Sequence, residues 1–193
     1  MVEVEAAGAG DDEVVLGAAP GSACQFAPSR YLRRRHCLGE DDFPRAEVIL
    51  EEAVERPEVA PGCKLAGEKR FSPYDNTWVT AASGLDVDHL VPLAESWDSG
   101  ASAWTAKRRE AYANDLATPT SLITVTAKSN RAKADKGPAD WMPPAAEYAC
   151  TYVTGWVETK LRWGLAADDR EREALLGLAE DCPGANISYE IAP

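Results

Sequence analysis

The chain has 193 residues, 45% hydrophobic and 27% charged, which is typical of a single folded domain and too apolar for a wholly disordered chain. No run approaches the roughly 18 consecutive apolar residues that a membrane-spanning helix needs, so we expect no membrane partner. The net charge is -12, but residues 64–163 hold as many basic as acidic residues. The charge therefore excludes a broad basic surface, but not a phosphate-bearing ligand in the middle of the chain.

The N-terminal end differs in composition from the rest of the chain. Residues 1–30 are rich in Ala, Gly and acidic residues and have no hydrophobic period, which predicts a flexible acidic tail before a single domain over residues 31–193. No signal peptide is visible, because the chain lacks the basic start and apolar run of an export signal. A removed signal, a different start and an intracellular protein all remain open.

Short elements are expected between residues 44 and 136. Hydrophobic residues recur at helical spacing over residues 44–56, between two prolines that suit the ends of a helix. Residues 63–79 alternate and turn around Gly, Pro and Asp-Asn, which predicts short strands or a hairpin. The elements expected next are a strand-like run at the start of residues 85–93, a helix over 105–116 capped by Thr105, a strand over 121–126 and a helix over 127–134.

The C-terminal end is predicted to be a helical hairpin over residues 146–182. Residues 148–165 carry a stripe of aromatic and aliphatic side chains at helical spacing, and Asp168 suits the cap of a last helix. Cys150 lies in the first helix and Cys182 directly follows the second. An antiparallel pair of helices brings these two cysteines together, so we predict a disulfide between them.

Five cysteines are spread along the chain without a C-x-x-C pair, which disfavours a zinc ribbon or a thioredoxin-like motif. Disulfides in an oxidising compartment are the favoured use, and five reduced thiols in the cytosol are the alternative. Because the number is odd, at least one thiol is left free or pairs outside the chain. The candidates besides the C-terminal pair are Cys24, Cys37 and Cys63.

Residues 85–93 carry two carboxylates followed at once by a histidine. Side chains alternate along a strand, so Asp86 and Asp88 point to the same side. Burying such charges without a partner costs several kcal/mol, so they need a cation, a partner or solvent. A divalent metal held by a carboxylate, with neutral His89 beside it as a general base, satisfies these needs.

Residues 128–136 supply the second half of the candidate site. Asn130 and Lys133 are three residues apart, so they share one face of the predicted helix. A neutral oxygen ligand and a cation on one face suit a metal-phosphate complex, although the run alone also fits a solvated basic helix. The order of strand, Asp-His, insertion, strand and helix favours the site.

This order of elements resembles the HNH, or ββα-metal, nuclease family. The runs DVDHLVP (residues 86–92) and SNRAKAD (residues 129–135) resemble the two halves of the HNH domain of RNA-guided CRISPR nucleases. Segments across residues 74–144 resemble small secreted HNH-type endonucleases of actinobacteria. The resemblance implies an α+β fold, with a ββα-metal motif over residues 85–136 inside a mainly helical domain. It also implies a secreted endonuclease that hydrolyses nucleic acid, DNA before RNA, with little sequence specificity.

Carried over residue by residue, the resemblance makes His89 the general base that activates water. Asp88 and Asn130 become ligands of one divalent metal, with Mg²⁺ or Mn²⁺ expected before Zn²⁺. Asp86 is a second or outer ligand, or a strand-end carboxylate bonded to backbone. Lys133 is expected to neutralise the phosphate. Arg131 is the alternative to Lys133 in this role. The basic residues expected to contact the substrate are Arg131, Lys128, Lys136 and Arg109.

The sequence departs from the family at the middle letter of HNH. Many relatives have an asparagine nine residues before the last one, where this chain has Ser121. Either Asn114 replaces it, or Ser121 bonds the same backbone. A catalytically inactive scaffold that binds nucleic acid or a protein, an intracellular nuclease and a disulfide-stapled interaction protein are the competing hypotheses. The favoured enzyme is expected to be a monomer, with an inhibitor or immunity protein as a further partner.

Overall fold

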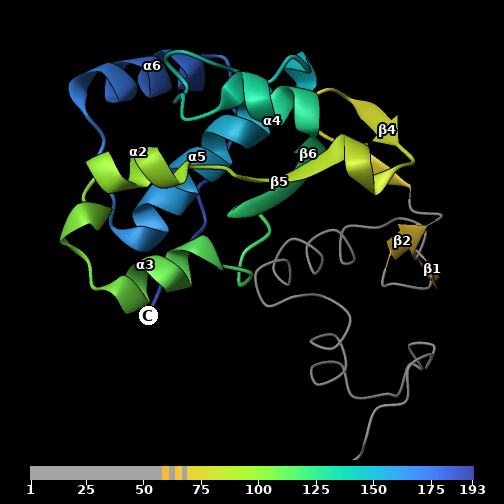
Figure 1. The fold of residues 1–193 in the computed structure, drawn as a ribbon. Helices are drawn as coiled ribbons and strands as arrows, with labels where there is room; N and C mark the ends of the chain where they lie inside the picture. The colour runs from red at the N-terminus through yellow and green to blue at the C-terminus, as the bar shows by residue number, and fades with distance from the viewer. Residues whose placement is uncertain (1–57, 61–63, 67–68) are drawn as a thin grey trace, which may run out of the picture.

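The computed structural model describes residues 58–60, 64–66 and 69–193. The predicted tail over residues 1–30, the predicted helix over 44–56 and Cys24, Cys37 and Cys63 lie outside the described residues. The described part contains three two-stranded antiparallel sheets and a larger body of helices (Figure 1). This composition agrees with the predicted α+β class.

Two short strand pairs precede the candidate site. Strand β1 (Glu58–Ala60) pairs with β2 (Lys64–Ala66), and β3 (Arg70–Ser72) pairs with β4 (Thr77–Val79). The turn between β3 and β4 contains Asn76 at φ 49°, a conformation that Asn tolerates better than most residues. The alternation over residues 63–79 predicted short strands or a hairpin, and this prediction is confirmed.

The third sheet carries the acidic motif. Strand β5 (Leu85–His89) pairs with β6 (Leu122–Thr126), and Asp88 lies opposite Ile123. Between the two strands the chain forms α2 (Leu93–Asp98) and α3 (Ala106–Ala113), and α4 (Ala127–Lys133) follows β6 at once. The helix α2 was not predicted from the sequence. Strands β5 and β6 and helix α4 lie side by side, whereas α3 lies at the opposite end of the helical body (Figure 1).

Helix α3 begins at its predicted cap and ends before its predicted end. Thr105 Oγ1 accepts a hydrogen bond from the Arg108 backbone N–H at 3.2 Å. The helix ends at Ala113, whereas the sequence predicted residue 116. Beyond it the Asp115 carboxylate accepts a hydrogen bond from the backbone N–H of Ala117 at 3.2 Å, a local bond that competes with helix continuation.

Two longer helices, α5 (Ala149–Trp163) and α6 (Asp169–Glu180), complete the fold. Gly164 ends α5 in the left-handed conformation at φ 65°, and Asp168 caps α6 by accepting from the Glu171 N–H at 2.7 Å. Helix α5 passes through the middle of the helical body, with α3 on one side and α4 and α6 on the other (Figure 1).

The core lies where α5 packs against the strands, and it is dominated by aromatic side chains. Tyr152 and Trp156 of α5 are fully buried, as are Tyr74 and Leu90. Tyr74 and Tyr152 meet edge to face with ring centroids 5.7 Å apart. The aromatic stripe predicted for residues 148–165 is therefore part of the core.

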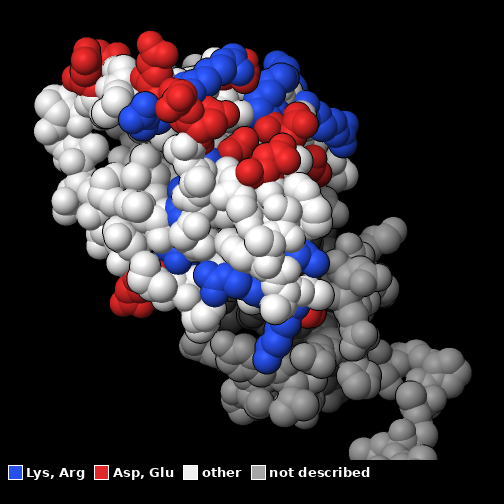
Figure 2. Space-filling view, turned by 90° about the vertical axis from the view of Figure 1, so that its left-hand side faces the viewer, with Lys and Arg blue, Asp and Glu red and all other residues white. Residues whose placement is uncertain are grey.

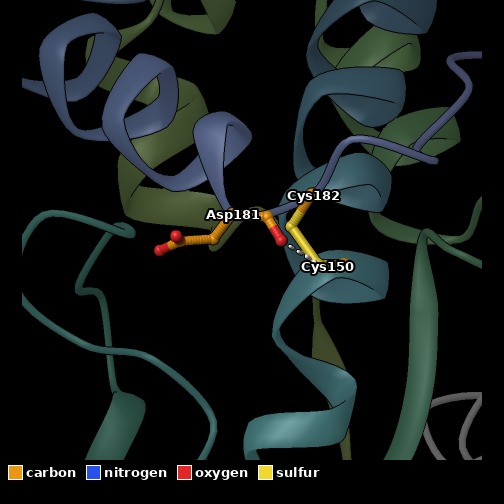
Figure 3. The surroundings of a disulfide bond; sticks show 3 residues. All are labelled: Cys150, Asp181 and Cys182. Atoms are coloured by element: carbon orange, nitrogen blue, oxygen red, sulfur yellow. Dashed lines mark hydrogen bonds between the residues drawn. A yellow bond between two sulfur atoms is a disulfide. The ribbon is translucent and has the colours of Figure 1, made fainter.

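A disulfide joins Cys150, near the start of α5, to Cys182, just after the end of α6, as predicted. Figure 3 shows the bridge between the two helices, with the carbonyl oxygen of Asp181 3.8 Å from the Cys150 sulfur. The Cα atoms of the two cysteines are 5.6 Å apart, which is an ordinary separation for a disulfide. The bridge therefore closes the pair α5 and α6 at its open end.

The surface of the helical body is charged in places rather than throughout. Figure 2 shows acidic and basic side chains mixed at the end formed by α6, uncharged surface below it, and a group of basic side chains lower on the same face. Among the helices that the structure describes, none has the length and apolar composition to cross a membrane.

Candidate active site

Helix α4 lies against strand β5, so the acidic side chains of the strand meet polar side chains of the helix. Asn130 Nδ2 donates to Asp86 Oδ2 at 3.2 Å. Lys133 Nζ lies 2.8 Å from Asp88 Oδ1 and 2.7 Å from Asp88 Oδ2. The strand side chains are two residues apart and the helix side chains three apart, so the alternation of the strand and the period of the helix bring them into two pairs.

The pair of Lys133 and Asp88 is buried. Lys133 is 0% exposed and Asp88 is 5% exposed. Tyr74 O–H donates to Asp88 Oδ2 at 2.6 Å, and Lys133 also donates to the carbonyl oxygen of His89 at 2.8 Å. Burial raises the pKa of Asp88 and lowers the pKa of Lys133, and the attraction between the two charges opposes both changes. The ammonium group therefore faces a carboxylate inside the protein.

His89 is the last residue of β5, and its side chain contacts the C-terminal end of α3. Its Nε2 lies 2.9 Å from the carbonyl oxygen of Ala113. A carbonyl only accepts, so Nε2 carries the proton and Nδ1 is the acceptor of the neutral ring. Burial lowers the pKa of His89, while the bond to Ala113 and the charge of Asp88 raise it; the net shift is downward. The imidazole is therefore neutral near pH 7.

Two residues after Ala113, Asp115 holds the segment that follows α3; the sequence analysis did not identify this residue. Its carboxylate accepts from Ser121 Oγ at 2.9 Å, from Arg162 Nε at 2.8 Å and from Trp163 Nε1 at 2.9 Å. Burial raises the pKa of Asp115, but the hydrogen bonds from Arg162, Trp163 and Ser121 lower it by more. The net shift of the pKa is downward. No local pattern in the sequence points to these contacts, because Asp115 and Arg162 are 47 residues apart.

The two residues that were expected to replace the middle asparagine of HNH are bonded in other ways. Asn114 Nδ2 donates to the carbonyl of Glu110 at 2.9 Å, within α3. The Ser121 hydroxyl bonds the Asp115 carboxylate, and the Ser121 carbonyl accepts from the Leu90 N–H at 3.1 Å. Ser121 therefore contacts both the loop after α3 and the residue that follows His89.

A second acidic residue, Asp75, fastens the β3–β4 hairpin to the start of α4. Its carboxylate accepts hydrogen bonds from Ser72 Oγ and Thr126 Oγ1, at 2.8 and 2.6 Å, and from Ser129 Oγ. Burial raises the pKa of Asp75, but these three bonds lower it, and the net shift is downward. Because Tyr74 is its neighbour, this anchor also sets the position of the phenol that bonds Asp88.

The four basic residues expected at the substrate fall into two groups. Lys128 and Arg131 of α4 and Lys136 just after it are exposed, on the helix that carries Asn130. Arg109 of α3 is partly buried: its guanidinium donates to the carbonyls of Ala101, at 3.4 Å, and Trp104, and lies over the Trp97 ring. Its charge is thus engaged within the fold.

Of the three predicted metal ligands, Asp86 and Asn130 contact each other. Asp86 and Asn130 are partly buried and hydrogen-bonded, and Asp88 lies two residues from Asp86 on the strand. Over the part of the chain that the structure describes, three or more His, Cys, Asp or Glu side chains do not gather as they do in an all-protein metal cage. Mg²⁺ uses one or two carboxylates and completes its shell with water and phosphate oxygens, so these donors fit it.

Comparison with known proteins adds two matches. Residues 41–178 match the family model described as GmrSD restriction endonucleases, C-terminal domain. A protein of Arthroderma benhamiae described as an uncharacterized secreted protein is 40% identical over 136 residues. That alignment covers 70% of this chain and 66% of the relative, so the chain spans just under two thirds of the relative's length. No solved structure gives a significant match.

Proposed function

The chain belongs to the family of the C-terminal domain of GmrSD restriction endonucleases, and we propose that it is a metal-dependent endonuclease of the HNH type. The family supports a nuclease that acts on nucleic acid. The finer assignment rests on one observation: His89 is fixed through Nε2 by the Ala113 carbonyl, which leaves Nδ1 as a proton acceptor. The strand that ends at His89 also carries Asp86 and Asp88, and Asn130 of α4 donates to Asp86, which supports the proposal.

In the proposed reaction Nδ1 of His89 removes a proton from water as the water oxygen attacks phosphorus. The bond from phosphorus to the 3′ oxygen breaks, and that oxygen takes a proton from solvent. The products are a 3′ hydroxyl and a 5′ phosphate. The lowered pKa of His89 keeps the base in its neutral form at pH 7.

Asp86, Asn130 and Asp88 are the residues proposed to hold a divalent metal; in the structure Asn130 bonds Asp86, and Asp88 bonds Lys133 and Tyr74. When bound, the metal would supply positive charge to the scissile phosphate and to the leaving oxygen. The donors are carboxylate and amide oxygens, which favour Mg²⁺ or Mn²⁺ over Zn²⁺, a metal that prefers nitrogen and sulfur ligands.

Lys133 takes a different role from the one expected of it in the sequence. Its Nζ is buried against Asp88 and the His89 carbonyl, so we propose that it holds the end of β5 in place. Exposed Arg131, next to Asn130 on α4, is then the better candidate to contact the phosphate, with Lys128 and Lys136 contributing further charge. Such contacts to phosphate carry little sequence information, so we propose weak specificity, with DNA as the substrate.

We also propose that the protein is secreted. The relative from Arthroderma benhamiae is described as secreted, and the bridge between Cys150 and Cys182 requires an oxidising compartment in most organisms. Titration of free thiols in the unreduced protein tests this proposal. One free thiol of the five supports secretion, and five free thiols contradict it.

The proposed activity is tested by nicking of supercoiled plasmid with Mg²⁺, with Mn²⁺ and with EDTA, and by cleavage of an RNA of matching sequence. Wild-type protein is expected to cut DNA only with metal, and His89→Ala to lose about 10²-fold or more of the rate. Asn130→Ala is expected to need more Mg²⁺ for half-maximal rate. Asn186→Ala, which changes an exposed residue of the C-terminal segment, is the matched control.

Two outcomes would contradict the proposal. Wild-type protein that is inert with both metals, while it still binds DNA, would make the chain a binding scaffold. A His89→Ala variant as active as wild type would leave the nuclease assignment to the family alone and remove His89 as the base.

A further inference from the structure

Ser121 links the two parts of the chain that fix His89: the segment after α3 and the end of strand β5. His89 Nε2 donates to the Ala113 carbonyl at 2.9 Å, and two residues later the Asp115 carboxylate accepts from Ser121 Oγ at 2.9 Å. The Ser121 carbonyl accepts from the Leu90 N–H at 3.1 Å, next to His89. Ser121, which directly precedes β6, is therefore bonded both to the segment after α3 and to the residue that follows His89.

Asp115 is in turn held by the C-terminal end of α5. Arg162 donates through Nε at 2.8 Å and through its second terminal nitrogen at 3.2 Å, and Trp163 donates through Nε1 at 2.9 Å. Two parallel bonds from one guanidinium to one carboxylate fix orientation as well as distance. The Trp163 ring meets Tyr112 edge to face at 5.3 Å, and Tyr112 directly precedes the residue whose carbonyl bonds His89.

We propose that Asp115 is the positioning residue for His89, and that α5 sets the tautomer of the base through it. The proposal rests on the proposed function for the role of His89. In this chain a buried carboxylate, held by Arg162 from 47 residues further along the sequence, fixes the segment whose backbone carbonyl bonds the imidazole. The clamp holds the Ala113 carbonyl toward Nε2, and this keeps the proton off Nδ1.

The alternative is that Asp115 only stabilises the fold. In that case its loss would lower stability and leave the tautomer of His89 unchanged. The two hypotheses predict different distributions of the proton between Nδ1 and Nε2 of the neutral His89 ring. The chain has two histidines, so nitrogen-15 NMR follows both imidazoles, and the His89→Ala variant identifies the signal of His89.

The experiment compares wild type with Asp115→Asn and Ser121→Ala. Asparagine keeps the shape of the side chain, but it loses the charge and one acceptor for Arg162 and Trp163. Alanine at 121 removes the single hydroxyl and keeps the backbone bond to Leu90. The matched control is Asp140→Asn, which removes an exposed ion pair with Arg170 on α6. Each protein is measured by tautomer state at a pH where His89 is neutral, by kcat and KM for plasmid nicking, and by melting temperature.

Wild type and Asp140→Asn are expected to hold His89 as the Nε2–H tautomer. Both test variants are expected to populate the Nδ1–H form and to lose about 10- to 100-fold in kcat with KM little changed, since small misplacements of a catalytic group cost up to about 10²-fold. An unchanged tautomer in folded Asp115→Asn or Ser121→Ala overturns the proposal, whatever happens to kcat. If Asp115→Asn does not fold, Ser121→Ala decides alone.

The tautomer measurement needs no nuclease activity. Wild-type protein that cuts nothing would therefore overturn the proposed function while the spectra still decide whether Asp115 orients His89. Active wild type with an unchanged tautomer in the variants would overturn only the positioning role.

Discussion

Replacing Lys133 with methionine tests whether the end of strand β5 depends on a buried ion pair. Methionine has a similar length and fills the space of the aliphatic stem, so the change removes mainly the charge. In the native structure Lys133 is 0% exposed, and its Nζ bonds both Asp88 oxygens and the His89 carbonyl. After the replacement the Asp88 carboxylate keeps only the hydrogen bond from Tyr74 among these buried partners.

The expected loss follows from the burial of the partner that remains. Breaking a buried ion pair from one side costs about 3 to 5 kcal/mol, because it leaves an uncompensated charge. The bond from Tyr74 is retained, which places the expected value near the lower end, at about 3 kcal/mol. For a domain of this size such a loss lowers the melting temperature by roughly 10 °C. An exposed lysine, by contrast, contributes within about 0.5 kcal/mol.

The loss is also expected to depend on pH. Without Lys133 the folded-state pKa of Asp88 rises further above its unfolded value near 3.9, because burial is no longer opposed by a cation. An acid with a raised folded pKa is most stable in its neutral form, so stability is present at low pH and is lost as the pH rises. The deficit of Lys133→Met relative to wild type is therefore expected to shrink between pH 7.5 and pH 5.

Urea unfolding with the disulfide intact, at three pH values, measures both effects. The matched control is Lys136→Met, which changes an exposed lysine three residues further along. A loss in Lys133→Met no greater than in Lys136→Met would refute the argument from burial. A loss that is large but equal at pH 5 and pH 7.5 would refute the part that depends on the charge of Asp88.

Three further outcomes are expected. Reduction of the bridge between Cys150 and Cys182, which are 32 residues apart, should cost about 4 kcal/mol of stability, and an unchanged guanidinium midpoint with reductant would contradict this. Gly155→Ala should cost about 1 to 3 kcal/mol, because the new Cβ would lie 2.7 Å from Leu90 Cδ2, whereas alanine at the unobstructed Gly177 should not lower the melting temperature. The kcat/KM of nicking should fall only below about pH 6.5, since the neutral base is required and burial lowers the pKa of His89; a midpoint above that value is the contrary result.

The parts of the fold that local pattern determines could be predicted from the sequence. Alternation identified β5 and β6, helical spacing identified α5, the cap residue Asp168 identified the start of α6, and Thr105 caps α3 as expected. The Cys150–Cys182 bridge followed from the order of two helices and the position of each cysteine at an outer end. In each case the signal lies within one turn or a few residues, and periodicity carries it.

The contacts that fix the candidate site lie outside that range. Tyr74 bonds Asp88 across 14 residues, Lys133 bonds it across 45, and Arg162 bonds Asp115 across 47. Each depends on how separate elements pack, and although the sequence motifs contain Asp88 and Lys133, nothing in the sequence pairs them. Asp115 was missed because its partners Ser121 and Arg162 belong to other parts of the fold.

Lys133 shows why a correct helix face does not settle a role. The spacing placed Asn130 and Lys133 on one side of α4, and in the structure both side chains bond carboxylates of β5. The spacing does not show how deeply each side chain is buried. Asn130, in the middle of α4, is partly buried, while Lys133, at its end, is fully buried against Asp88. A fully buried cation is not placed to contact a phosphate in solvent, but it can hold a strand end in place, because removing either partner of the pair leaves an uncompensated buried charge. Under the proposed function, the exposed cations of α4 would contact the substrate, so the inner and outer faces of this short helix would have different tasks.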